Sequence, residues 1–172
     1  MLWILILKSL YLFLPAYVAN MAPVLFRKMP LLNKPINEKR FGTNKTWRGI
    51  IVATIFGGIV FILQKYFHSR GFQSLSLIDY SDFSILFGFI LGFGAIMGDL
   101  IKSYYKRKAG IPPGKPWIPY DQLDFVLGGL ILGLFFYVPP ANVILVLFVV
   151  SPILHLGINF IGYLFGINES KW

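Results

Sequence analysis

The sequence predicts an all-α integral membrane protein with five transmembrane helices, and three observations support this fold class. Of its 172 residues, 56% are hydrophobic, whereas soluble domains are typically about 45–50% apolar. The mean hydropathy is +0.69, and 17 residues are Phe. The apolar residues also fall into five long segments separated by charged or Pro- and Gly-containing stretches. The absence of cysteine excludes disulfides, thiolate catalysis and Cys-based zinc sites.

A single membrane-embedded domain, residues 1–172, is expected, because the five segments leave little chain for a separate soluble domain. The first segment is too long for a signal peptide and has neither a basic beginning nor a small-residue cleavage site, so we expect a retained span. The predicted spans cover about residues 2–25, 48–67, 83–103, 121–138 and 141–165, and the two cytoplasmic loops cover residues 26–47 and 104–120.

The distribution of cations predicts the orientation in the cell membrane. Seven Lys or Arg residues lie between Arg27 and Arg48, and five lie between Lys102 and Lys115. The opposite side carries only Lys65 and Arg70. The positive-inside rule therefore places the N-terminus outside and the C-terminus in the cytoplasm. An alternative reading is that these cations only set the topology and contact anionic lipid headgroups.

The run from Asp99 to Asp124 concentrates charge at the predicted membrane edge. It holds three of the seven acidic residues, the third being Asp121. Charged groups at such depth are costly and usually mark a functional site. The apolar parts of the flanking spans, residues 83–98 and 125–138, have only 16 and 14 residues, fewer than the ~20 that a full crossing needs. The acids are therefore expected slightly inside the bilayer, in a polar cavity at the cytoplasmic side.

Helical spacing predicts that these side chains converge. Asp99, Lys102, Ser103 and Lys106 are spaced as i, i+3, i+4 and i+7, which places them on one helix face. Asp121 and Asp124 share a face of the next helix, an expected antiparallel neighbour. Carboxylates suit magnesium, and Lys and Arg suit phosphate oxygens. We therefore predict one or two Mg²⁺ ions held by Asp99, Asp121 and Asp124, with phosphates bound by Lys102, Ser103, Lys106, Arg107 and Lys115.

Two loop segments complete the predicted site. The stretch 110–119 contains four prolines and two glycines and could carry Lys115 over the cavity as a lid. In the segment 42–49, Thr43 or Asn44 is expected to cap the following helix. Free N–H groups at that helix start, together with Lys45 and Arg48, form an anion site. The alternative is an ordinary capped helix with interfacial cations.

The remaining polar and small residues are expected to have structural roles. Neither His lies near the acidic cluster in the sequence, so direct in-line attack by a substrate phosphate is favoured over a covalent intermediate. His155 and Asn159, one helical turn apart, are expected to form an interhelical hydrogen bond rather than a metal site. The glycines of the third span, at positions 88, 92, 94 and 98, are expected to serve helix packing, and they also permit a homodimer.

Taken together, these motifs resemble the signature of the phosphatidate cytidylyltransferase (CDP-diglyceride synthase) family. The matching elements are Ser103-x-x-Lys106-Arg107, the Gly/Pro loop with Lys115, and Asp121-x-x-Asp124-Phe125. The compact five-span form, with Asn44-Lys45-Thr46-Trp47-Arg48-Gly49 upstream, is similar to the archaeal branch, the CDP-archaeol synthases. Bacterial and eukaryotic members carry His-Gly-Gly before the first Asp and Arg after it. Here Trp117-Ile118-Pro119-Tyr120 and Gln122 stand there, which favours the archaeal branch.

The resemblance implies an enzyme of phospholipid biosynthesis. Its substrates would be CTP and an isoprenoid ether phospholipid, 2,3-bis-O-(geranylgeranyl)-sn-glycerol 1-phosphate, and its products CDP-archaeol and pyrophosphate, with magnesium as cofactor. Asp121 and Asp124 would bind metal, with Asp99 as a further candidate, and Lys106 and Arg107 would also act in catalysis. By the same resemblance, the nucleotide or its phosphates would be held by Asn44, Lys45, Thr46 and Arg48.

Four alternatives to this function are weighed against the same residues. The acids could form buried ion pairs that lock two helices together. The acceptor could be ordinary phosphatidic acid. A CDP-alcohol phosphatidyltransferase would need an Asp-Gly-x-x-Ala-Arg pattern, which is absent. A transporter with a cation site would be favoured by inverted repeats and broken helices, which are not seen. Membrane lipid is an expected partner, and nucleic acid is not.

Overall fold

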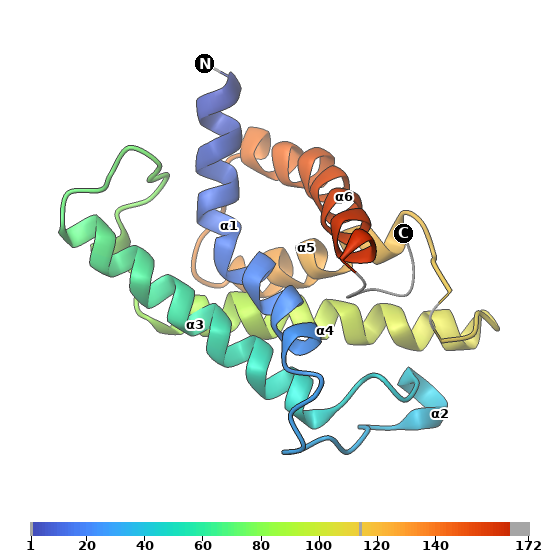
Figure 1. The fold of residues 1–172 in the computed structure, drawn as a ribbon. Coiled ribbons are helices and arrows are strands. Elements are labelled where there is room, and N and C mark those ends of the chain that lie inside the picture. Colours follow the sequence, from blue (N-terminus) through green and yellow to red (C-terminus); the bar gives the residue numbers. More distant parts are fainter. Residues whose placement is uncertain (1, 114, 166–172) are drawn as a thin grey trace.

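The computed structural model describes residues 2–113 and 115–165 and shows an all-helical chain in that range (Figure 1). The helices are α1 (Leu2–Leu25), α2 (Glu38–Phe41), α3 (Trp47–Ser69), the short 3-10 helix η1 (Tyr80–Asp82), α4 (Leu86–Lys108), α5 (Tyr120–Gly133) and α6 (Ala141–Leu164). The predicted all-α class is confirmed.

Within this range, four helices are long and apolar enough to cross a membrane: α1, α3, α4 and α6. The fourth predicted span, residues 121–138, corresponds to α5, which has only 14 residues and ends at Gly133 rather than at residue 138. Directly after the helix the chain forms a turn, in which the N–H groups of Phe136 and Tyr137 both bind the carbonyl of Gly133. By contrast, α4 continues to Lys108, beyond its predicted end at residue 103.

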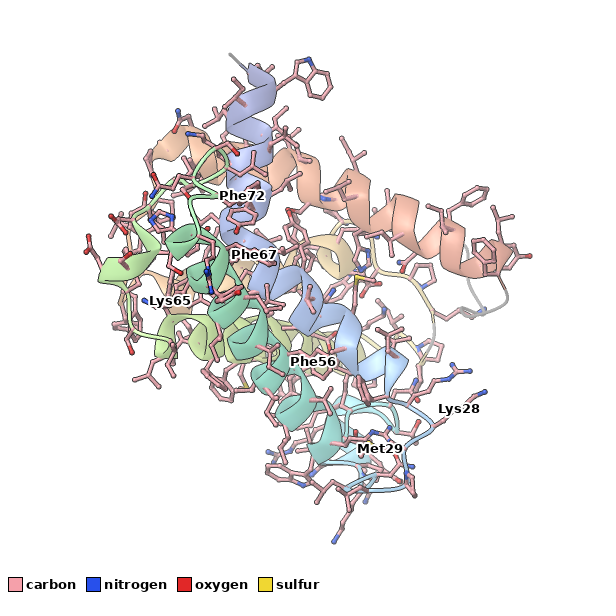
Figure 2. All side chains as sticks on the ribbon, turned by 60° about the vertical axis from the view of Figure 1, so that its left-hand side comes forward. Lys28, Met29, Phe56, Lys65, Phe67 and Phe72 are labelled. Atoms are coloured by element: carbon pink, nitrogen blue, oxygen red, sulfur yellow. The ribbon has the colours of Figure 1, made fainter. Side chains whose placement is uncertain are left out.

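Helix α4 lies at the centre of the bundle and packs against α1, α3 and α5. Among the described helices, α6 contacts only α1 and α5 (Figure 1). Figure 2 shows Lys28 and Met29 at one end of the bundle, and Lys65 with Phe72 at the other. There Lys65 Nζ binds the carbonyl oxygens of Tyr80 and Phe83 at 2.6 and 2.5 Å, which fixes η1 against α3.

Glycines set the distances between the central helices. A methyl group at Gly98 would overlap the carbonyl oxygen of Asp124, and one at Gly128 would overlap that of Gly94. Helices α4 and α5 therefore touch backbone to backbone, on the turns that carry the acidic residues. On the other side of α4, a methyl at Gly92 would meet the carbonyl of Ala53 in α3. The predicted packing role of these glycines is confirmed.

Candidate active site

Six of the predicted site residues line one pocket at the end of the bundle where α4 leaves it. The pocket holds about 390 Å³ of empty space. The predicted residues in its wall are Asn44, Lys45, Lys102, Ser103, Lys106 and Arg107, joined by Phe41, Gly42 and Pro113. Two segments far apart in the sequence, the end of the first long loop and the last turns of α4, thus form a single cationic site.

Short local motifs determine the conformation of the segment 37–49, which leads from α2 into α3. The side chain of Asn37 caps α2 by accepting the N–H of Arg40 at 3.0 Å. Gly42 follows with φ of 89°, a conformation that favours glycine. The cap of α3 is Thr46, whose Oγ1 accepts the N–H of Gly49 at 3.2 Å. The expectation that Thr43 or Asn44 caps this helix was wrong, because the helix begins only at Trp47.

Lys102 lies at the centre of the predicted acidic cluster. Its Nζ is 3.1 Å from Asp99 Oδ1, 2.8 Å from Asp121 Oδ1 and 2.9 Å from Asp124 Oδ2. The three carboxylates therefore do converge, as the helical spacing predicts. The group at their meeting point, however, is the ammonium of Lys102, which was expected to face phosphate.

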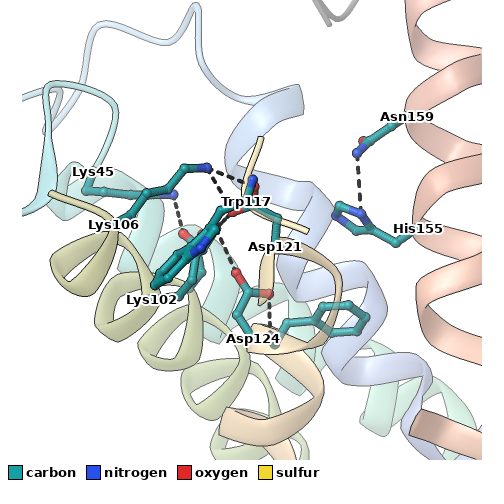
Figure 3. Close-up of polar contacts among 10 residues, drawn as sticks. Lys45, Lys102, Lys106, Trp117, Asp121, Asp124, His155 and Asn159 are labelled. Carbon is teal, nitrogen blue, oxygen red and sulfur yellow. Dashed lines mark hydrogen bonds and ion pairs between the residues drawn. The ribbon is translucent and has the colours of Figure 1, made fainter. Parts of the chain in front are cut away.

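Two further lysines flank the cluster. Lys45 Nζ forms an ion pair with Asp99, which ties the loop after α2 to α4. Lys106 Nζ binds both oxygens of Asp121 at 3.0 and 2.8 Å, and the N–H of Trp117 donates to Asp121 Oδ2 at 2.5 Å (Figure 3). Three ammonium groups thus balance three carboxylates, and the ion pairs considered as a structural alternative are present between α4 and α5.

Arg107 differs from these lysines. It lines the pocket, and its Nε and Nη1 are buried without a hydrogen-bond partner among the described residues. A buried guanidinium with unused N–H donors costs free energy unless an acceptor is supplied. Guanidinium N–H groups match phosphate oxygens in geometry and charge. Arg107 therefore indicates that the pocket takes an anionic ligand, which ion pairs made only for stability would not require.

The donor chemistry of the cluster fits a divalent cation only if Lys102 moves. Oxygen ligands from carboxylates suit Mg²⁺. Yet among the residues that the structure describes, no group of three or more His, Asp or Glu side chains is arranged to hold a metal ion. Lys102 Nζ stands within 3.1 Å of all three carboxylates. An ion there would replace the charge that Lys102 now supplies.

Besides the three acids of the cluster, three further predicted residues lie outside the wall of the pocket: Thr46, Arg48 and Lys115. Thr46 acts as the helix cap already described. Arg48 is 7% exposed and its Nη1 binds the carbonyl of Met29, so it anchors the preceding loop. Lys115 is exposed, and its backbone N–H binds the carbonyl of Pro112 at 3.3 Å. The lid expectation for Lys115 stays a prediction.

Sequence reasoning missed the apolar part of the pocket wall. Phe41 packs its ring against Tyr104 of α4, with ring centroids 6.3 Å apart. Gly42 lies so close to Pro113 that an added Cβ would be 3.7 Å from its Cγ. Both lie within three residues of Asn44, where the Asn44–Gly49 motif begins, so their position was a usable signal. Pro113 belongs to the predicted Gly/Pro loop.

Comparisons with known proteins identify the family of this chain. The model of the CarS-like CDP-archaeol synthase family matches residues 2–172. The CDP-archaeol synthase of Thermococcus onnurineus is 34% identical over 175 residues, covering 97% of each chain. That of Thermofilum pendens is 35% identical, covering 96% of this chain and 80% of the relative.

One solved structure is also similar to this chain. It is described as that of an intramembrane enzyme for archaeal membrane lipids biosynthesis, and it matches with a TM-score of 0.71 and 27% sequence identity. The match covers 90% of this chain and 94% of the other. With the family model matching nearly every residue, this chain belongs to the CDP-archaeol synthase family.

Proposed function

We propose that this protein transfers the cytidylyl group of CTP to 2,3-bis-O-(geranylgeranyl)-sn-glycerol 1-phosphate, giving CDP-archaeol and pyrophosphate. Family membership supports the reaction. The observation that carries the proposal to particular residues is Arg107, whose buried Nε and Nη1 have no hydrogen-bond partner in the part of the chain that the structure describes. Its pocket is also lined by Lys45, Lys102 and Lys106. A triphosphate supplies acceptor oxygens for these Arg107 donors, and its charge suits the neighbouring lysines.

The reaction is a direct phosphoryl-type displacement. An oxygen of the lipid phosphate forms a bond to the α-phosphorus of CTP, and the bond between that phosphorus and the bridging oxygen to the β-phosphorus breaks. Negative charge grows on the departing pyrophosphate. Arg107 and Lys106 are placed to stabilise that charge by donating hydrogen bonds, which lowers the barrier more than it stabilises the ground state. Lys45 holds the loop of Asn44 against α4, which positions the nucleotide.

We further propose that Asp99, Asp121 and Asp124 hold Mg²⁺ when nucleotide is bound. The ion would neutralise part of the triphosphate charge. Lys102 lines the pocket, so its ammonium could turn from the carboxylates to a phosphate oxygen. The same residues would thus serve metal-free and nucleotide-bound forms with different partners.

The protein is a multi-pass membrane protein with several apolar helices. We propose that its pocket faces the cytoplasm, with the N-terminus outside, because the cationic loops flank the pocket and Lys65 and Arg70 lie at the other end. A homodimer would need faces other than the α4 glycines, since these are covered by α3 and α5 within one chain.

The test is a reaction with labelled CTP and magnesium in detergent. One sample contains the archaeal ether phospholipid, one contains phosphatidic acid, and one contains the ether lipid with EDTA. Labelled CDP-lipid that forms with the ether lipid and disappears with EDTA is the expected result. A preference for phosphatidic acid would instead favour the CDP-diacylglycerol synthase alternative.

Variants connect the reaction to the cluster. Asp124→Asn should abolish turnover while leaving the protein folded. Near-wild-type activity in Asp124→Asn would contradict the metal assignment. If the wild-type protein did not bind magnesium and CTP at all, the transporter alternative would be favoured instead.

A further inference from the structure

Helix α6 carries a polar face that the pocket described above does not use. It is the most apolar of the four candidate spans, with a mean hydropathy of 2.3. Even so, Ser151, His155 and Asn159 follow one another at intervals of four residues, which puts them on one side of the helix. Polar side chains within a membrane helix are costly, and they usually face the protein interior or a functional cavity.

The first residue of this face has a structural role. The hydroxyl groups of Ser151 and Tyr17 lie 2.5 Å apart, and Ser151 is fully buried. This contact fixes the middle of α6 to α1. Beyond Ser151, none of the described residues of α6 is buried, and Ile158 and Ile161 are 41% and 53% exposed. The second half of α6 therefore borders lipid on one side and the bundle on the other.

His155 faces the bundle beside the acidic cluster. Its ring stacks on that of Phe125, with centroids 6.1 Å apart and an interplanar angle of 26°. Phe125 directly follows Asp124, and its N–H donates to Asp124 Oδ1 at 2.5 Å. Figure 3 shows His155 and Asn159 projecting from α6 toward the side where Asp121 and Trp117 lie. His155 thus contacts the residue that directly follows one of the three carboxylates.

The contact with Asn159 sets the tautomer of His155. Asn159 Nδ2 lies 3.3 Å from His155 Nδ1. An amide nitrogen can only donate, so Nδ1 accepts, and a neutral imidazole then carries its proton on Nε2. An interhelical hydrogen bond was expected here, whereas this bond joins two residues of the same helix, α6. The contact with Asn159 therefore leaves His155 with an oriented N–H donor, Nε2–H, at the border between the lipid and the charged cluster.

We propose that His155 Nε2–H binds a phosphate oxygen of the lipid acceptor, with Asn159 as the residue that positions it. This rests on the proposed function and names the side from which the acceptor arrives. The phosphomonoester would reach the cluster past the lipid-facing half of α6, while its isoprenoid chains stay in the bilayer. CTP enters from the opposite side, where Arg107 and Lys45 line the pocket. The two anionic substrates thus have separate donors.

The kinetic test compares His155→Phe, which keeps the ring stacked on Phe125 but removes the donor, with the wild-type protein. Loss of one hydrogen bond to a charged group costs about 1.5–3 kcal/mol, so the KM for the lipid should rise about 10-fold or more. The KM for CTP should stay unchanged. His155→Gln, which retains an N–H donor, should recover most of the affinity. Asn159→Leu should raise the lipid KM less than His155→Phe does, because the imidazole stays but loses its orientation.

A matched control and a binding measurement separate this inference from the proposed function. Ile161→Phe adds the same ring on the exposed part of α6 and should leave both KM values unchanged. Without nucleotide, the wild-type protein should bind the ether lipid phosphate more tightly than the corresponding alcohol, and His155→Phe should lose that preference. Inorganic phosphate should compete only weakly, because it lacks the chains that hold the lipid in the bilayer.

Two results would overturn the inference. One is an equal preference for the phosphate over the alcohol in the wild type and in His155→Phe. The other is a parallel rise of both KM values, which would indicate a general structural role for His155. A wild-type protein that binds the lipid phosphate through His155 but forms no CDP-lipid would contradict the proposed function and leave the lipid site standing.

Discussion

Lys102 Nζ lies 2.9 Å from Asp124 Oδ2, and this contact joins α4 to α5 at the buried end of the acidic cluster. The same ammonium group also contacts Asp99 and Asp121. Lys102 is therefore the one of the three lysines that all three acids share. A cation that enters the cluster has to displace it, and this competition can be measured.

We expect Lys102→Met to be less stable than the wild type without magnesium, and to be rescued by it. Removing one partner of a buried ion pair costs about 3–5 kcal/mol, although Lys45 and Lys106 still balance part of the charge. Thermal unfolding in detergent, with and without Mg²⁺, measures the effect. The melting temperature of Lys102→Met should rise more with Mg²⁺ than that of the wild type.

The exposed Lys108 supplies the control for that measurement. Lys108→Met removes the same charge from the same helix, but Lys108 lies on the exposed end of α4. It should behave like the wild type with and without Mg²⁺. If Mg²⁺ raised the melting temperatures of all three proteins equally, the ion would not be competing with Lys102.

Arg107→Ala should weaken CTP binding strongly, because it removes the unpartnered N–H donors of the pocket. Charge-assisted hydrogen bonds contribute about 1.5–3 kcal/mol each, so we expect the KM for CTP to rise about 10–100-fold. Stability should not fall, since no described contact of Nε or Nη1 is lost. Lys115→Ala, in the exposed loop, should change the same KM far less. A larger effect at Lys115 would support the lid instead.

Gly98→Ala should lower both stability and activity, because the added methyl group would overlap the carbonyl oxygen of Asp124. Overpacking of this kind costs about 1–3 kcal/mol. It also moves α5, and with it Asp121 and Asp124, away from α4. Gly157→Ala in α6 is the control, because a Cβ there has no neighbour within 4 Å. Circular dichroism melts and turnover should both separate these two variants.

Thr46→Ala should destabilise the start of α3 by about 1 kcal/mol, the usual cost of losing a helix cap. Thr46 Oγ1 accepts the N–H of Gly49, whereas Thr43 is exposed. Thr43→Ala therefore serves as the control, and Thr46→Ser, which keeps the hydroxyl, should restore stability. Chemical denaturation reports the difference. Equal effects at positions 43 and 46 would argue against the cap.

Much of this architecture could be predicted from local patterns. The apolar segments gave the positions of the long helices, and the i, i+3 spacing of Asp121 and Asp124 placed both acids on one face. The pocket residues Lys45 and Arg107 came from motifs that carry charge beside a helix end, whereas Asn44 came from the family resemblance. These features depend only on neighbours in the sequence, so a linear reading was sufficient.

The remaining features depend on three-dimensional packing. Lys102 was expected to bind phosphate, but its side chain contacts carboxylates from two helices. The i, i+3 spacing indicates the contact with Asp99, whereas no spacing rule specifies those with Asp121 and Asp124. Arg48 anchors a loop through the carbonyl of Met29, a backbone atom without a sequence signal. Helix α5 ends at Gly133 because the following four residues form a turn. These residues are apolar, so a prediction from hydrophobicity alone placed the end of the span too late.

The backbone contact of Gly98 and Gly128 has an evolutionary consequence. Because the main chains of α4 and α5 already touch, the separation of Asp99 from Asp124 cannot be adjusted by exchanging small side chains between the helices. Relatives that adapt to other acceptor lipids would therefore keep this pair of helices rigid. Their variation should accumulate in the loop before α3 and on α6, the parts that can change without altering the spacing of the acids.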